Sequence, residues 1–251
     1  MSNNRPFTLT IAGFDPSGGA GVLADIKTFE QHLVYGLAII TGNTIQTDSN
    51  FVRMEWVSIA FVTESIETLF NKYEIKAVKI GIIPSLEYLE TIVATIKNIA
   101  PSTKIIWDTV LKSSTEFNFL TVENQTKLHT ILKQIDLITP NYYEILRLGD
   151  SNQSAENNAK SFSKFCAVLL KGGHNMSALG TDSLFIADQI ITFSPITKIS
   201  GSKHGSGCVL AASITANIAL GFDIVTACKI SKIYIEKFLT SNTTLLGYHH
   251  D

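Results

Sequence analysis

Hydrophobic residues along the chain fall into short continuous runs that are separated by longer amphipathic segments. Short apolar runs are typical of strands that are buried on both faces of a sheet. The segments between them carry apolar residues at every third or fourth position, as helices that cover a sheet do. The expected strands span residues 7–12, 36–41, 77–81, 105–110, 137–140 and 168–171. The expected helices begin at Val22 and span 63–73, 86–99 and 122–134.

This alternation predicts one α/β domain over residues 1–251, with helices on both faces of a mostly parallel sheet. The pattern changes after Lys171, where a hairpin of 183–186 and 189–193 and then a helix over 208–219 are expected. We interpret the polar stretch 149–158 as a surface connection, because strands and helices alternate across it. Ligands of such sheets bind beyond the carboxyl ends of the strands, so the loops there are the expected site.

Composition and charge exclude several classes of protein. A hydrophobic content of 45% and a charged content of 17% are typical of a chain with a large buried core. The net charge of -2, with Lys and Arg dispersed, argues against a nucleic-acid partner. No signal peptide or membrane segment is expected. The 3 cysteines lack CxxC spacing, which favours a reducing cytoplasm over disulfides or structural zinc.

The strongest chemical signal is a glycine segment, residues 202–208, that opens the helix 208–219. Gly205 and Gly207 let the backbone approach a ligand, and the first helical turn offers unpaired N–H groups. Such donors suit a phosphoryl group in transfer. Cys208 lies where helix N-termini depress a thiol pKa, so it would deprotonate a hydroxyl or orient it. The alternative is a small buried cysteine that only packs.

A second glycine segment, 13–21, leads into the helix that carries Asp25. The segment lacks the Gly-Lys-Ser/Thr ending of a P-loop, and it does not read as the dinucleotide-binding GxGxxG motif. Asp25 would present its carboxylate to a ring amine. A solvated helix carboxylate is the alternative.

Polar residues also stand at the ends of the later expected strands, namely Asp108, Asn141, Glu144 and Lys171. Carboxylate oxygens are the ligands that Mg²⁺ prefers, so Asp108 and Glu144 are the candidate metal residues. Lys171 would bind a phosphate or form a salt bridge at the strand end.

Four motifs, taken together, resemble the hydroxymethylpyrimidine/phosphomethylpyrimidine kinases of thiamine biosynthesis. They are LTIAGFDPSGGAGVLADIKTF, ITPNYYEI, VLLKGGH and KHGSGC. The closing Tyr248-His249-His250 is also similar to the end of that family. Because the four motifs occur in the family's order across most of the chain, the resemblance is specific.

The resemblance implies a ribokinase-like, three-layer α/β/α fold, usually a homodimer. It also implies that ATP, with Mg²⁺, phosphorylates 4-amino-5-hydroxymethyl-2-methylpyrimidine to its monophosphate and then to the diphosphate. Asp25 and Gln46 would hydrogen-bond the aminopyrimidine. The residues that would line its ring are Gly13, Ala20, Thr44, Ile82 and Val110.

The resemblance also implies roles on the phosphate side. Cys208 would take the place of the catalytic aspartate of the related sugar kinases. The anion hole would be formed by Gly205, Ser206 and Gly207. The ATP and Mg²⁺ side would be formed by Asp108, Lys112, Asn141, Glu144 and Lys171, with Lys112 aligned loosely.

The chain departs from the family pattern at three places. Thr47-Asp48 stands where the family usually has Asn-Thr, Thr44 replaces a commonly apolar residue, and the segment after Asp108 is one residue shorter. Two alternatives stay open. A pyridoxine or pyridoxal kinase also phosphorylates a hydroxymethyl group on a small ring, and a non-catalytic member of the fold would bind a ligand without turnover.

Overall fold

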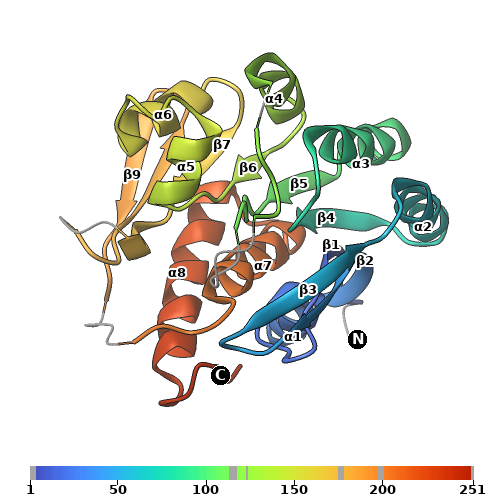
Figure 1. The fold of residues 1–251 in the computed structure, drawn as a ribbon, viewed down its shortest axis with the longest axis horizontal. Helices are drawn as coiled ribbons and strands as arrows, with labels where there is room; N and C mark the ends of the chain where they lie inside the picture. The colour runs from blue at the N-terminus through green and yellow to red at the C-terminus, as the bar shows by residue number, and fades with distance from the viewer. Residues whose placement is uncertain (1–3, 113–117, 123, 175–177, 197–200, 250–251) are drawn as a thin grey trace.

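The computed structural model describes residues 4–112, 118–122, 124–174, 178–196 and 201–249. Within these residues a sheet of nine strands runs in the order β3-β2-β1-β4-β5-β6-β7-β8-β9 (Figure 1). The strands are β1 Phe7–Phe14, β2 Tyr35–Gln46, β3 Phe51–Trp56, β4 Ile75–Ile80, β5 Lys104–Trp107, β6 Leu137–Ile138, β7 Ala167–Leu170, β8 Asp182–Ile186 and β9 Gln189–Phe193.

The six central strands, from β2 to β7 in the sheet order, are parallel to one another. At one edge β3 pairs antiparallel with β2. At the other edge β8 pairs antiparallel with β7, and β9 pairs antiparallel with β8. The mostly parallel sheet and the predicted hairpin are therefore confirmed. Because parallel strands point the same way, the loops after β1, β4, β5, β6 and β7 gather at one edge of the sheet.

Helices cover both faces of the sheet. One face is covered by α1 Gly21–Gln31, α7 Ser206–Ala219 and α8 Ile224–Thr240, and the other by α2 Ile59–Lys72, α3 Leu86–Ile99, α4 Gln125–Leu132, α5 Tyr142–Leu148 and α6 Ala155–Phe162. Successive side chains of a strand point to opposite faces. Accordingly, Ile105 and Trp107 of β5 lie in the core beneath α2–α6, while Ile106 lies in the core beneath α1, α7 and α8. The predicted three-layer arrangement is confirmed.

Several elements differ from the sequence prediction. Strand β2 extends to Gln46 and pairs with β3, an exposed edge strand whose mixed residues gave no clear alternation. Helix α6 begins at Ala155, inside the stretch interpreted as a surface connection. Helices α5 and α8 were not predicted. Strand β5 ends at Trp107, because the chain turns there and Val110 N–H donates to Asp108 O at 2.8 Å.

No helix among the described residues combines the length and the apolar character that a membrane span needs.

The fold predicts where side-chain truncation costs most. Ile92 of α3 is 0% exposed, whereas Ile99 at the end of the same helix is 40% exposed. Ile92→Ala is expected to lower the free energy of unfolding by about 2–5 kcal/mol, because it leaves a cavity in the packed core. Ile99→Ala, the matched control, should cost much less. Urea denaturation measures both, and equal losses would contradict this placement of the core.

Candidate active site

A row of polar side chains crosses the carboxyl ends of the parallel strands, on the face covered by α7. The alternation of the strands produces it. Ala77, Ile106, Leu137 and Leu169 lie in the core beneath α1, α7 and α8, and the residue two positions after each of them is polar. Together with Thr10 of β1, the row consists of Thr10, Lys79, Asp108, Thr139 and Lys171. On β4, β5, β6 and β7 the apolar residues of this face are thus followed by a polar or charged group.

Asp25 of α1 is held at one end of this row. Its Oδ2 accepts hydrogen bonds from Thr10 Oγ1 at 2.6 Å and from Lys79 Nζ at 2.8 Å. The side chains of Asp25 and Lys79 are both 0% exposed. Asp25 Oδ1 is buried as well, and it has no hydrogen-bond partner among the described residues. The solvated-carboxylate alternative is therefore wrong, and Oδ1 is left as an unused buried acceptor.

Asp108 has the same arrangement on the other side of α7. Its Oδ1 accepts from Lys171 Nζ and from Thr139 Oγ1, each at 3.0 Å, while its buried Oδ2 has no partner within the part of the chain that the structure describes. Burial alone would raise the pKa of Asp108, but Lys171 and Lys79 outweigh it and hold that pKa below its ordinary value. Asp108 therefore stays ionised with one oxygen unused.

Asn141 and Glu144 form a capping box at the start of α5. Asn141 Oδ1 accepts from the N–H groups of Tyr143 and Glu144, and Glu144 Oε2 accepts from Asn141 N–H at 2.7 Å. Burial raises the pKa of Glu144, and Lys171, at 3.6 Å from Oε2, opposes that rise. The spacing of Asn141 and Glu144 thus has a local reason, because both satisfy backbone groups at a helix start. The same spacing also places Glu144 Oε2 3.6 Å from Lys171 Nζ.

The two glycine segments pack against each other. Gly205 is the N-cap of α7, with φ 73°, and a Cβ on it would overlap the carbonyl oxygen of Gly19. His204 Nε2 lies 2.8 Å from Asp15 Oδ2, which also accepts from Ala20 N–H at 2.9 Å. Segments that the sequence suggested independently are therefore two walls of one site.

Cys208 lies in the first turn of α7, between the two lysine–carboxylate pairs. Burial, assisted by Asp108 and Asp25 and opposed by Lys79, raises its thiol pKa to about 12. The expected depression of this pKa is wrong, because burial and the two nearby carboxylates outweigh Lys79 and a backbone hydrogen bond from Gly21. The thiol is protonated at neutral pH. One residue earlier, a Cβ on Gly207 would lie 3.3 Å from Lys171 Nζ.

The residues expected to line a ring are partly brought together. A Cβ on Gly13 would overlap the Ile82 side chain, and Ala20 lies against Gly205. Thr44 Oγ1 donates to Phe14 O at 2.8 Å. The hydroxyl at this commonly apolar position is therefore satisfied by the backbone.

The remaining predicted residues lie at the end of β2 and in the segment that follows β5. Gln46 ends β2 and is half-buried, and Val110 is half-buried two residues after Asp108. Lys112 pairs with Asn118 across a short backbone bridge. Thr47-Asp48 belongs to the turn between β2 and β3, where Thr47 N–H donates to Asn50 O at 2.8 Å. Part of the shortened segment after Asp108, namely Ser113 and Ser114, lies outside the described residues, as does His250.

Sequence reasoning missed Lys79, the residue at the centre of the buried charges, and the pair of His204 and Asp15. Lys79 did give a signal, since a lysine inside an apolar strand buried on both faces needs a carboxylate partner. The pairing of His204 with Asp15 gave none, because the two residues are 189 positions apart.

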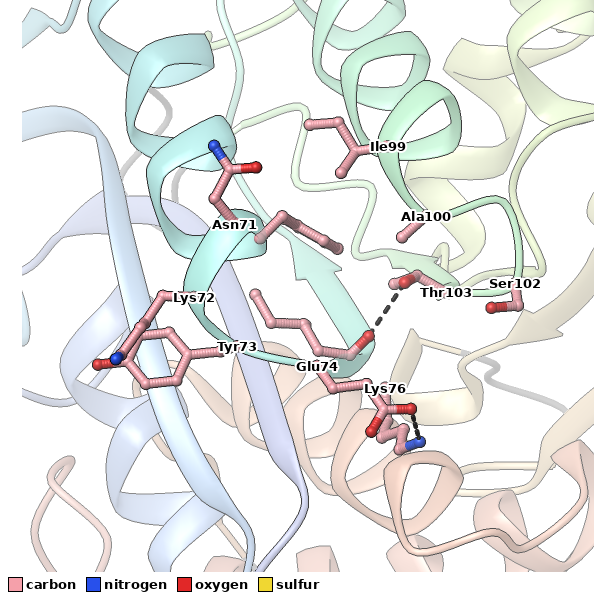
Figure 2. Close-up of a pocket in the computed structure, with 11 residues that line it drawn as sticks. Asn71, Lys72, Tyr73, Glu74, Lys76, Ile99, Ala100, Ser102 and Thr103 are labelled. Atoms are coloured by element: carbon pink, nitrogen blue, oxygen red, sulfur yellow. Dashed lines mark hydrogen bonds and ion pairs between the residues drawn. The ribbon is translucent and has the colours of Figure 1, made fainter.

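Figure 2 shows a pocket of about 400 Å³ at the opposite edge of the sheet. It lies at the start of β4 and beside the ends of α2 and α3, where Glu74 pairs with Lys76 and Thr103 Oγ1 donates to Ile75 O at 3.0 Å. The polar row stands instead at the ends of the strands. This pocket is therefore separate from the candidate site.

Comparisons with known proteins identify the family of the chain. The family described as phosphomethylpyrimidine kinase matches residues 15–251. A hydroxymethylpyrimidine/phosphomethylpyrimidine kinase of Aquifex aeolicus is 33% identical, over 94% of this chain and 95% of the relative.

Two solved structures have the same fold. A phosphomethylpyrimidine kinase of Clostridium difficile 630 is 29% identical with a TM-score of 0.76, covering 93% of this chain and 99% of that one. A Bacillus subtilis pyridoxal kinase, solved as its ADP complex, is 24% identical with a TM-score of 0.83, and the match covers 96% of this chain and 94% of that one. At this identity the similarity shows only that the two proteins share a fold. On the family match and the 33% identical relative, the chain belongs to the phosphomethylpyrimidine kinase family.

Proposed function

We propose that this protein transfers the γ-phosphoryl group of ATP to the hydroxymethyl group of 4-amino-5-hydroxymethyl-2-methylpyrimidine, and then phosphorylates the monophosphate to the diphosphate, in thiamine biosynthesis. The observation that carries the proposal is the pair of half-satisfied buried carboxylates, Asp25 and Asp108, on either side of the first turn of α7. Asp25 is suited to bind the amine of a ring, and Asp108 is suited to the side where the phosphates and the metal would bind.

The ring would bind at the Asp25 end of the site. Asp25 Oδ1 is an unused acceptor, which matches the exocyclic amine of the substrate. Gln46 would offer its amide to the neighbouring ring nitrogen. The walls would be formed by Gly13, Ala20, Thr44, Ile82 and Val110.

The migrating phosphoryl group would lie at the N-terminus of α7. The backbone N–H groups of Gly205, Ser206, Gly207 and Cys208 would form the anion hole there. Lys171 Nζ, close beneath Gly207, adds a positive charge. Phosphoryl transfer passes through a loose transition state that needs positioning more than a strong base. A protonated Cys208 is therefore suited to orient the substrate hydroxyl.

The nucleotide would approach from the ends of β5, β6 and β7, with Asn141, Lys171 and Lys112 on its side. Mg²⁺ fits this end because Asp108 Oδ2 is an unused oxygen and Glu144 is near. Among the described residues, no three His, Cys, Asp or Glu side chains gather to hold a metal by themselves. Phosphate oxygens and waters would then complete its shell, and the ion would neutralise charge on the phosphates.

Other expectations extend this proposal. A single catalytic domain, a homodimer and a cytoplasmic location follow from the family resemblance and the composition, as does the absence of a nucleic-acid partner. A pyridoxal kinase is the second candidate, because solved pyridoxal kinases share the fold. Asp25 Oδ1 favours the aminopyrimidine over it.

The substrate assignment predicts that hydroxymethylpyrimidine is phosphorylated with a kcat/KM at least about tenfold above that of pyridoxal, because a buried carboxylate selects the ring that offers it an amine. Coupled measurement of ADP release with each substrate tests this. A higher kcat/KM for pyridoxal would reverse the assignment, and pyrimidine binding without ADP release would indicate a non-catalytic protein.

The anion hole predicts that Gly207→Ala lowers kcat by about 10²-fold, because a methyl group would stand between the phosphoryl group and its N–H donors. Gly207 has helical backbone and its Cβ would meet only the end of the Lys171 side chain, at 3.3 Å, so the melting temperature should change little. Gly205→Ala should instead lower the melting temperature, since its φ is 73° and its Cβ would overlap Gly19. An unchanged kcat in Gly207→Ala would remove this residue from the site.

The raised thiol pKa gives a separate prediction for Cys208. Because the thiol stays protonated below about 12, the pH profile of kcat should show no thiol ionisation between about pH 6 and 9. Cys208→Ala should lower kcat by no more than about tenfold, the effect of one neutral hydrogen bond. Stopped-flow or steady-state rates across that range check both points. A loss beyond about 10³-fold would show that the thiol acts as a base.

A further inference from the structure

Lys79 is a buried cation with no role in the functional assignment above. It lies near the end of β4, its side chain is 0% exposed, and its Nζ is 2.8 Å from Asp25 Oδ2. Burying an ammonium group costs several kcal/mol unless a well-placed anion compensates it. Asp25 provides that anion. The pair lies directly beneath the site where the ring is proposed to bind.

The geometry fixes which atom of Asp25 can accept a further bond. Oδ2 receives two donors, from Lys79 Nζ and Thr10 Oγ1. A proton on Oδ2 would face the Lys79 ammonium group, which cannot accept a hydrogen bond, and a proton on Oδ1 would find no acceptor among the described residues. The ion pair with Lys79 therefore favours the carboxylate form of Asp25, in which Oδ1 can accept a hydrogen bond but cannot donate one.

The ionised state of Asp25 depends on the positive charge of Lys79. The pKa of Asp25 is raised above its ordinary value, because burial, with a contribution from Asp108, outweighs the opposing effects of Lys79 and Thr10. For Lys79, burial favours a lower pKa, but Asp25, Cys208 and Asp108 outweigh it and raise the pKa above the ordinary value. The lysine stays protonated. Without its charge, desolvation and Asp108 would both drive a proton onto Asp25.

We propose that Lys79 is a positioning residue that sets ring selectivity by keeping Asp25 a hydrogen-bond acceptor. The site then takes a ring that presents an amino donor, and it rejects the matching ring that presents an oxo group. This inference rests on the proposed kinase activity. If Asp25 were protonated, it would donate to the oxo oxygen instead, and the preference would weaken or reverse.

The test compares Lys79→Met with Lys79→Gln, which keeps a hydrogen-bond donor and loses the charge. Lys76→Met is the matched control, since Lys76 is an exposed lysine of the same strand. The two probes are 4-amino-5-hydroxymethyl-2-methylpyrimidine and its 4-oxo analogue. Binding is measured by calorimetry without ATP, and kcat and KM are measured with ATP, both from about pH 6 to 9.

In Lys79→Met and Lys79→Gln, the KM for the amino ring should rise at least about tenfold while kcat falls less, because the lost interaction is one of binding. The ratio of amino to oxo affinity should fall at least about tenfold. Amino-ring binding by the variants should tighten as pH rises, since binding then requires Asp25 to lose a proton. Lys76→Met should match the wild type. Wild-type affinity, selectivity and pH dependence in both Lys79 variants would overturn the inference.

Protein stability gives a readout that needs no substrate. Burial already raises the folded pKa of Asp25 in the wild type, and Lys79→Met removes the charge that opposes this rise. As pH rises above about 4, the free energy of unfolding of Lys79→Met should therefore fall further than that of the wild type, because its native state holds the extra proton more tightly. The double variant Asp25→Asn/Lys79→Met should lack this dependence. If both single variants fail to fold, folding of the double variant supports the inference and its failure overturns it.

These outcomes separate the inference from the proposed function. A wild-type protein that does not phosphorylate the aminopyrimidine contradicts the function, even where the pH dependence of unfolding follows the expected course. An active wild type whose Lys79 variants keep their selectivity contradicts the inference alone.

Discussion

Two buried lysine–carboxylate pairs, Lys79 with Asp25 and Lys171 with Asp108, are the constraint around which the candidate site is organised. In each pair one carboxylate oxygen accepts from a lysine and a threonine, and the other oxygen has no recorded partner. Charges in a protein interior are tolerated when such partners compensate them. The protein therefore holds two oriented acceptors in place before a ligand arrives, at the cost of burying four charged groups.

The parallel sheet makes this arrangement possible. Its central strands end at one edge, so residues far apart in the sequence become neighbours whose side chains point to the same face of the sheet. α7 then begins above that edge, with its free N–H groups beside the charges. A rearranged strand order would keep the hydrophobic core but disperse the polar row.

Much of the fold could be read from the sequence, because short apolar runs and amphipathic segments differ in period. Strand β3 was not predicted because polar and apolar residues are mixed along it and most are not buried. Helix α5 was not predicted because a helix of seven residues shows little periodicity. The glycine segments and strand-end carboxylates were recognisable as residue types. What the sequence could not supply were contacts across the fold, which decide that Asp25 is buried and that Cys208 is desolvated rather than activated.

The contact between His204 and Asp15 has a consequence for biosynthesis. These residues are separated by 189 positions, and the loop carrying Asp15 leaves the ribosome long before α7 does. Until α7 arrives, the sheet face that bears Lys79, and Asp25 of α1 beside it, lack the helix that later packs against them. A nascent chain that stops short of residue 203 therefore leaves the charges of Lys79 and Asp25 without the helix that packs over them in the complete fold.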